Sequence, residues 1–153
     1  IRNASQVVAN AGLGGLLGAC ALFDTEFAFQ YTILLAAAFA SSASDTLSSE
    51  IGNAYGTKYT DIKTLRNGLK GENGVISIEG SIAGVIGALI IGWVYSAYYD
   101  NYSLLLLLTV SGMLGNLADT LLGAWLERSN LISNNFVNFL NTLTAAVFMA
   151  IIA

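Results

Sequence analysis

The chain contains neither proline nor histidine, has one cysteine, and carries few charged side chains. Without histidine, this chain forms neither a histidine-based catalytic triad nor a zinc site of the usual kind. Cys20 alone cannot form an internal disulfide, and its apolar neighbours indicate a packing role. The net charge of −4 and the lack of a basic stripe with interleaved aromatic residues argue against nucleic acid as a partner.

Apolar residues dominate what is present. Of the 153 residues, 55% are hydrophobic and 10% are charged, whereas a soluble domain carries about 25% charged residues. A membrane-spanning helix needs about 20 mostly apolar residues. We therefore expect one transmembrane domain over residues 1–153, an all-α polytopic helix bundle with about five spans. The predicted spans are Gln6–Phe23, Phe27–Ser44, Val75–Tyr98, Leu104–Trp125 and Phe136–Ala153.

The distribution of basic residues predicts an orientation for these spans, because cytoplasmic loops of membrane proteins are enriched in Lys and Arg. With five spans, the N-terminus and the loops 52–74 and 127–135 share one side of the membrane. All six basic residues fall on that side: Arg2, Lys58, Lys63, Arg66, Lys70 and Arg128. We expect an integral membrane protein whose loops 52–74 and 127–135 are cytoplasmic and whose C-terminus is outside.

Two stretches repeat Asp-Thr-Leu among small residues near the end of a hydrophobic segment. The first, residues 41–52, places Asp45 and Glu50 where the apolar run 27–40 meets water. Glu50 follows Asp45 by five residues, so the two carboxylates converge only if the helix ends or bends here, which the flanking serines and glycine permit. The alternative interpretation of Asp45 is an ordinary polar helix end.

The second stretch, residues 115–123, contains Asp119 inside an otherwise apolar segment. A charge deep in a membrane helix costs roughly 2.5–3.5 kcal/mol, which makes such a residue a functional candidate. The alternative is a buried aspartate that joins helices by hydrogen bonds. We predict that the two acidic turns meet in the folded protein and hold a metal-bound phosphate.

The loop 52–74 is rich in charge, with four basic residues against Asp61 and Glu72. It is interpreted either as a topology determinant that attracts anionic lipid headgroups or as a clamp on phosphates. Its last part, residues 70–77, is a glycine-rich turn leading into a helix, and backbone N–H groups at a helix N-terminus bind anions. The spacing is not that of a Walker A motif.

Polar residues gather at the cytoplasmic ends of the predicted segments, and the outer halves are nearly free of them. In the first segment Arg2, Gln6 and Asn10 follow at four-residue spacing, as expected either for a polar site or for helix packing. A pore or transporter more often carries polar residues through the membrane midplane. A one-sided site suits chemistry on a lipid headgroup with a water-soluble cytosolic partner.

Five motifs in fixed order cover nearly the whole chain: Arg2 with Gln6-Val7-Val8-Ala9-Asn10, Ala43-Ser44-Asp45-Thr46 with Ser49-Glu50-Ile51-Gly52, Gly71-Glu72-Asn73-Gly74-Val75-Ile76-Ser77, Gly115-Asn116 with Asp119-Thr120-Leu121-Leu122-Gly123-Ala124, and Asn134-Asn135-Phe136-Val137-Asn138. With these motifs the chain resembles the integral-membrane family of transmembrane protein 19 and plant phytyl-phosphate kinase. The family usually reads Asn/Asp-Gly-Gly-Val-Ser, whereas here a single Gly74 replaces the glycine pair and Ile76 precedes Ser77. Family members commonly carry additional N-terminal helices, which agrees with a chain that begins at Ile1 and not at Met.

The resemblance implies a membrane phosphotransferase that converts an isoprenoid (phytyl or polyprenyl) monophosphate to the diphosphate. The expected cofactor is Mg²⁺, the phosphoryl donor is CTP or ATP, and the partners are the isoprenoid phosphate, the nucleotide and membrane lipid. Asp45 and Asp119 are the expected catalytic metal ligands, with Glu50 in support. The expected substrate- and nucleotide-binding residues are Arg2, Gln6, Asn10, Lys63, Arg66, Lys70, Glu72, Asn73, Gly74, Ser77, Glu79, Asn116 and Asn138.

The alternative is a non-catalytic ion-coupled transporter or lipid-handling membrane protein. In that case the same carboxylates bind a coupling ion, and the two Asp-Thr-Leu stretches mark parallel repeats.

Overall fold

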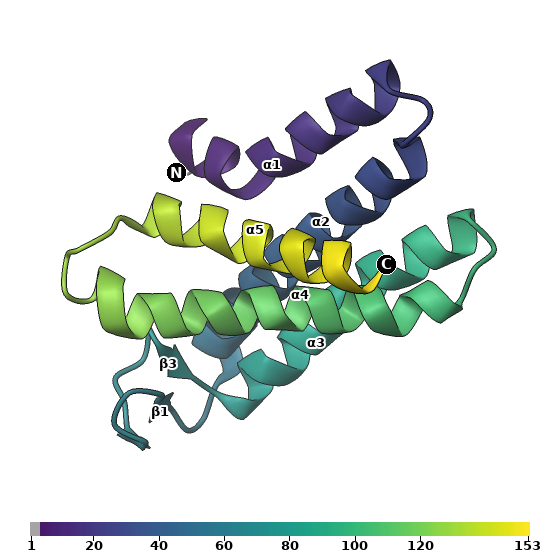
Figure 1. The fold of residues 1–153 in the computed structure, drawn as a ribbon. Coiled ribbons are helices and arrows are strands. Elements are labelled where there is room, and N and C mark those ends of the chain that lie inside the picture. Colours follow the sequence, from purple (N-terminus) through teal and green to yellow (C-terminus); the bar gives the residue numbers. More distant parts are fainter. Residues whose placement is uncertain (1–3) are drawn as a thin grey trace.

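The computed structural model describes residues 4–153, which form a bundle of five long helices and one small sheet (Figure 1). The helices are α1 (Ala4–Phe23), α2 (Ala28–Tyr55), α3 (Ile78–Tyr98), α4 (Ser103–Leu122) and α5 (Asn134–Ile152). The predicted all-α polytopic bundle is confirmed. Four of the helices (α1, α3, α4 with the turn that extends it, and α5) are long and apolar enough to cross a membrane.

The remaining helix, α2, is the centre of the bundle and packs against each of the other four. It falls outside the group of apolar spans because its C-terminal half carries serines and two acids. Most of its buried side chains are small, among them Ala37, Ala40 and Ser41, none of which is exposed. Small residues let neighbouring helices approach closely, and Ser41 and Ser44 accordingly face protein instead of lipid.

The sequence prediction placed the end of the second segment at Ser44, and the structure corrects this. The helix continues through the acidic stretch to Tyr55, since the stretch contains no proline to interrupt it. It ends at Gly56, where the Tyr59 hydroxyl donates to the carbonyls of Gly52 (3.0 Å) and Gly56 (2.9 Å). The acidic stretch is therefore a regular part of a long helix.

Helices α2, α4 and α5 pack closely together at Gly115. A side chain at this position would overlap the Ser41 hydroxyl of α2 and would lie 2.7 Å from the Asn141 carbonyl oxygen of α5. The Ser41 hydroxyl also donates to the carboxamide oxygen of Asn141. Farther along the same helices, an apolar cluster that includes Ile33, Leu108 and Met149 fills the core.

The connection between α2 and α3 forms a three-stranded antiparallel sheet, a feature that the sequence analysis did not predict. Its strands are β1 (Thr60–Asp61), β2 (Arg66–Asn67) and β3 (Val75–Ile76), in the order β2-β1-β3. Val75 pairs with Asp61 and Ile76 with Thr60, so these residues form a strand and not the predicted start of the third helix. The helix begins at Ile78, because the Ser77 hydroxyl caps it by accepting from Gly80 N–H at 3.1 Å.

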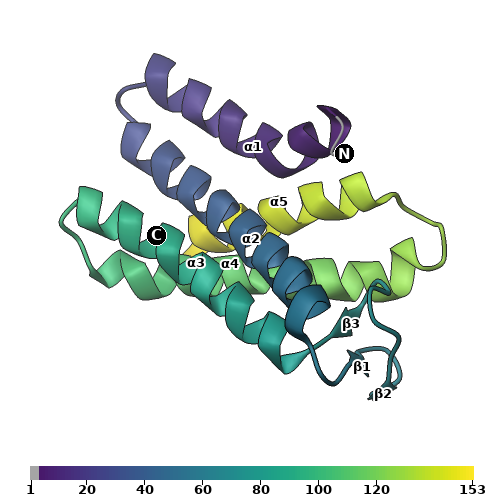
Figure 2. The same cartoon turned by 180° about the vertical axis from the view of Figure 1, so that it is seen from behind.

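The two ends of the bundle differ in charge. Figures 1 and 2 place the sheet, the α4–α5 connection and the start of α1 at one end, and the α1–α2 and α3–α4 turns and the C-terminus at the other. The basic residues within the described range all belong to the first end: Lys58, Lys63, Arg66, Lys70 and Arg128. Arg2 lies outside the described residues. We call the first end the sheet end.

Candidate functional site

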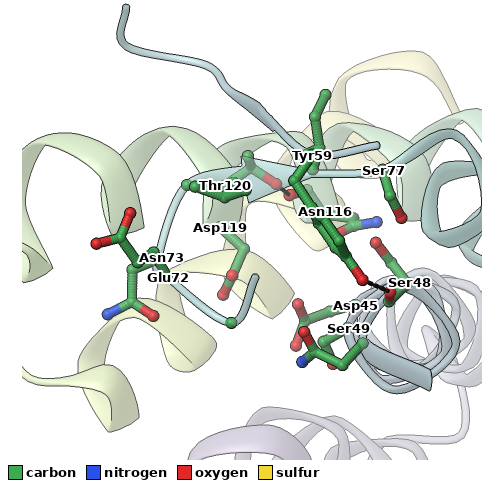
Figure 3. A pocket seen from close by; sticks show the side chains of 16 residues that line it. Asp45, Ser48, Ser49, Tyr59, Glu72, Asn73, Ser77, Asn116, Asp119 and Thr120 are labelled. Carbon is green, nitrogen blue, oxygen red and sulfur yellow. Dashed lines mark hydrogen bonds between the residues drawn. The ribbon is translucent and has the colours of Figure 1, made fainter. Parts of the chain in front are cut away.

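Asp45 and Asp119 come from the two Asp-Thr-Leu stretches and face one cavity at the sheet end (Figure 3). They meet because α2 and α4 both run toward this end (Figure 1). The two carboxyl groups are close enough to interact electrostatically. The cavity has a volume of about 170 Å³. It is lined by Asp45, Ser48, Ser49, Gly52, Asn53, Tyr59, Gly71, Glu72, Asn73, Gly74, Val75, Ile76, Ser77, Asn116, Asp119 and Thr120. We call it the acidic cavity.

Asp119 has an unusual environment for a carboxylate. One of its side-chain oxygens, Oδ1, is shielded from solvent and accepts no hydrogen bond from the described residues. A buried polar atom without a partner costs free energy, and native proteins rarely keep one without a reason. Asp119 also lines a polar cavity, which makes its carboxyl group a candidate for binding a ligand there.

A second polar cavity, of about 220 Å³, adjoins the first. Both share Asp45, Ser49, Asn73 and Asp119. Its other lining residues are Gln6, Asn10, Thr46, Asn134 and Asn138. We call it the amide cavity, because α1 and α5 each contribute two carboxamides to its wall. The two aspartates thus stand where two polar chambers meet.

The carboxamides of this second chamber are partly engaged in hydrogen bonds within their own helices. The Asn10 side chain donates to the backbone carbonyl of Gln6 at 3.0 Å, and its side-chain oxygen is buried without a partner among the described residues. Asn138 donates to the Asn134 side-chain oxygen at a longer 3.4 Å. Asn10 and Asn138 retain polar groups that a ligand is able to use.

The turn 72–74 forms the wall of the acidic cavity opposite α2 and is held against the end of α4. Gly74 has a φ of +77°, and a side chain there would overlap Ala124. Ala124 belongs to η1 (Gly123–Glu127), a π-helical turn that continues α4. Only glycine satisfies both the left-handed backbone and this close contact.

Arg128 follows η1 and fastens the same turn. Its guanidinium donates to the Asp61 carboxylate at 2.6 Å and to the backbone carbonyl of Asn73. Asp61 also accepts from the backbone N–H groups of Lys63 (2.8 Å) and Thr64 (3.1 Å). The hydrogen bond from Arg128 is the main reason that the pKa of Asp61 lies below its ordinary value.

The remaining polar groups of the acidic cavity are positioned by hydrogen bonds of the helices themselves. Asn116 donates to the Ser44 hydroxyl at 3.1 Å, which joins α4 to α2. The Thr120 hydroxyl donates to the Asn116 carbonyl at 3.0 Å. Ser77 lines the cavity while its hydroxyl accepts from Gly80 N–H.

Several predicted site residues lie elsewhere. Because α2 is regular, Glu50 points about 140° away from Asp45 around the helix axis; it is exposed and lines neither polar cavity. Within residues 4–153 no three Asp, Glu, Cys or His side chains form a group suited to a metal ion. The structure therefore separates Glu50 from Asp45 and Asp119, and this pair remains as the candidate for metal binding.

The predicted phosphate clamp is also absent from the walls of these cavities. Lys63, Arg66 and Lys70 are exposed on the sheet loop and line neither chamber. Glu79 instead accepts from the backbone N–H (3.1 Å) and the hydroxyl (2.7 Å) of Thr57, and so ties the end of α2 to the start of α3. The predicted Arg2 lies outside the described residues.

The structure adds residues that the sequence analysis did not select. Ser48 and Thr120 line the acidic cavity. Ser48 follows Asp45 by three residues and Thr120 follows Asp119 directly, and this proximity in sequence was a signal that could have identified both. Arg128 was assigned only a topological role. Its pairing with Asp61 joins residues 67 positions apart, so no local pattern indicates it.

The donor set of the acidic cavity fits Mg²⁺. The cavity offers carboxylate, hydroxyl and carboxamide oxygens, which hard cations prefer, and Mg²⁺ is typically held by one or two carboxylates together with substrate phosphates. No Lys or Arg between residues 4 and 153 lines either chamber. A phosphate group in this acidic environment therefore requires a cation to offset the repulsion from the two aspartates.

Comparison with known proteins identifies relatives along nearly the whole chain. Residues 1–146 match the family described as integral membrane protein DUF92. An uncharacterized membrane protein of Methanocaldococcus jannaschii is 34% identical over 151 residues, which are 99% of this chain and 62% of that protein. An uncharacterized membrane protein of Synechocystis sp. is 31% identical over 112 residues, 72% of this chain and 43% of that protein. No solved structure matches the chain.

Proposed function

The chain belongs to the integral membrane protein family DUF92, and we propose that it is a membrane phosphotransferase that converts an isoprenoid monophosphate to the diphosphate. The phosphoryl donor is a nucleoside triphosphate, CTP or ATP, and the cofactor is Mg²⁺. The observation that carries the proposal is the pair Asp45 and Asp119, which lie on two separate helices and face the junction of two polar cavities.

Two adjoining chambers suit a reaction that brings together two phosphorylated substrates. Phosphoryl transfer requires little from a protein beyond positioning and neutralisation of charge. Asp45 and Asp119 would hold the Mg²⁺, which neutralises charge on the phosphates when bound. The Ser48 hydroxyl of α2 offers a donor to a phosphate oxygen. The hydroxyls of Ser49 and Thr120 donate to the backbone carbonyls of Thr46 and Asn116, so they offer lone pairs to the cavity. The turn 72–74, fixed by Arg128, closes the opposite side.

The reaction is an in-line displacement at phosphorus. A terminal oxygen of the isoprenoid monophosphate attacks the γ-phosphorus of the nucleotide and forms a new P–O bond. The P–O bond to the bridging β–γ oxygen breaks, and the nucleoside diphosphate leaves with that electron pair. The attacking oxygen is already ionised at neutral pH, so the reaction needs no strong general base, which agrees with a chain that lacks histidine.

The proposal places the sheet end on the cytoplasmic side and the C-terminus outside. The basic residues of the described chain gather at that end, as the positive-inside rule expects. The nucleotide then reaches the acidic cavity from the cytosol, and the lipid reaches it from the membrane. Lys63, Arg66 and Lys70 remain available to attract anionic headgroups or an approaching nucleotide to the rim.

The test is transfer of radiolabel from γ-labelled CTP and ATP to phytyl or geranylgeranyl monophosphate, with the purified protein and Mg²⁺. We expect label in the lipid diphosphate, and its loss in Asp45→Ala. Glu50→Gln is the matched control, because Glu50 lies on the same helix but outside the cavity. Absence of transfer from the folded full-length protein with every donor and chain length would refute the proposal and favour the ion-coupled or lipid-handling alternative.

A further inference from the structure

We propose that the isoprenyl chain of the substrate leaves the acidic cavity sideways, through a groove between α3 and α4 that opens on the membrane-facing surface. This inference rests on the proposed phosphotransferase function and assigns a path to its lipid substrate. The groove has a volume of about 170 Å³ and shares Ser48, Ile76, Asn116 and Thr120 with the acidic cavity. It therefore continues the polar chamber toward the surface of the bundle. We call it the lateral groove.

The lining of the lateral groove changes from polar to apolar along its course. At its inner end, Ser44 and Asn116 are joined by a hydrogen bond of 3.1 Å. At its outer end stand Val85 of α3 and two side chains of α4, Met113 and Leu117, which are 41% and 46% exposed. Such a gradient matches a molecule with a charged head and a hydrocarbon tail.

The surroundings of the groove identify the tail as that of a lipid. Both α3 and α4 are apolar enough to cross a membrane, so the outer end of the groove faces hydrocarbon. A peptide in this position would leave backbone polar groups without partners, which the membrane interior does not tolerate. An isoprenyl chain has no such groups and gains favourable burial against Val85 and Met113.

An apolar surface continues beyond the lateral groove along the same pair of helices. Ser81, Val85, Leu89 and Trp93 follow at four-residue spacing and so lie along one face of α3. Leu89 and Trp93 line a further apolar groove of about 280 Å³, together with Leu105 of α4. From Ser81 to Trp93 the helix rises about 18 Å. This distance provides a track for a chain of several isoprene units.

A larger groove on the other side of the bundle is the rival path. It lies between α1 and α5, has a volume of about 530 Å³ and is lined mainly by apolar side chains such as Phe136 and Phe139. It shares no lining residue with either polar cavity. A hydrogen bond of 2.9 Å from Asn135 to Ser5 also joins two residues of its wall. A lipid bound there would not place its phosphate beside Asp45 and Asp119.

The first test is photo-crosslinking of the full-length protein in lipid nanodiscs. The probe is geranylgeranyl monophosphate with a diazirine at the end of its chain. We expect label on peptides of α3 and α4, with competition by unmodified geranylgeranyl monophosphate. Val85→Trp and Met113→Trp should each lower the labelling about tenfold, the range in which apolar pockets discriminate. Val147→Trp is the matched control, because Val147 is half exposed on α5 and lines neither groove.

Two results would overturn the inference. One is label concentrated on α1 and α5, and the other is label on α3 and α4 that neither tryptophan variant reduces.

The second test compares substrates of different chain length. Val85→Trp should lower kcat/KM for geranylgeranyl monophosphate about tenfold more than it lowers kcat/KM for dimethylallyl monophosphate, whose chain is too short to fill the groove. An equal loss for both would also overturn the inference. Labelling of α3 and α4 by a protein that transfers no phosphate would support the lateral groove and refute the phosphotransferase function.

Discussion

Replacing Gly74 by alanine tests how the cavity wall is built. Gly74 combines a left-handed backbone, φ +77°, with a position at which a side chain overlaps Ala124. Left-handed backbone costs a non-glycine residue about 1–2 kcal/mol, and an overpacked methyl group costs about 1–3 kcal/mol. Gly74→Ala should therefore destabilise the protein by about 2–5 kcal/mol, which corresponds to a fall in Tm of about 4–20 °C for a chain of this size.

A double variant tests the contact between residues 74 and 124. Ala124→Gly removes the nearest atom that Gly74→Ala would meet, but it leaves the backbone Cα (2.6 Å) and N (2.9 Å) of residue 124 in overlap and does not change φ at residue 74. The double variant should thus regain only part of the overlap cost, about 0.5–1.5 kcal/mol relative to Gly74→Ala corrected for the Ala124→Gly effect, a coupling expected of residues in direct contact. Thermal unfolding in detergent, followed by intrinsic fluorescence, measures all four proteins. A Gly74→Ala protein as stable as the wild type, or additive effects in the double variant, would refute this account of the turn.

Three further predictions concern charge. Asp119→Asn should lower turnover by about a thousandfold, equivalent to about 4 kcal/mol of transition-state stabilisation. The circular dichroism spectrum of the variant should match that of the wild type. Retained turnover would exclude Asp119 as a metal ligand. Replacement of Lys63, Arg66 and Lys70 by glutamine should leave kcat within a factor of about three, because none of the three lines a polar cavity. The same replacement should weaken the interaction of the sheet loop with anionic lipid by about 1 kcal/mol per residue. A kcat reduced as strongly as in Asp119→Asn would show that these residues take part in the reaction. The pKa of Asp61 is lowered in the folded protein. Its stabilising effect is therefore present at pH values above the ordinary pKa of about 3.9 and is lost as the pH falls through the folded-state value. Below a pH of about 4, Tm should fall less steeply with pH in Asp61→Asn than in the wild type, and equal slopes of Tm against pH would contradict the ion pair of Asp61 with Arg128.

The helical architecture could be predicted because apolar length and charge placement are local properties of a sequence. Long apolar runs identified α1, α3, α4 and α5. The repeated Asp-Thr-Leu stretches pointed to Asp45 and Asp119, which the structure brings to one cavity. The residues at which the helices begin and end were harder to predict from the sequence. Whether α2 ends at Ser44 or continues to Tyr55 depends on packing inside the bundle, where Ser41 and Ser44 are buried and Asp45 faces the acidic cavity.

The details that could not be predicted all depend on contacts between distant residues. The strand pairing of Val75 with Asp61 competes with helix formation and is decided by the sheet. The role of Arg128 depends on a partner in another connection. For Glu50 the deciding fact was the regularity of α2, since a bend would have turned its carboxylate into the cavity and a straight helix turns it away. The loop lysines were attractive phosphate ligands by charge alone, yet their side chains lie on the exposed surface of the sheet loop.

Mn²⁺ binding measured by electron paramagnetic resonance tests most directly whether Asp45 and Asp119 together hold a divalent cation. Mn²⁺ substitutes for Mg²⁺ at oxygen ligands and gives a signal that distinguishes bound from free ion. The wild-type protein and Glu50→Gln should bind the ion with equal affinity, and Asp45→Asn and Asp119→Asn should each weaken binding at least about tenfold. Equal binding by all four proteins, or a loss confined to Glu50→Gln, would contradict the account.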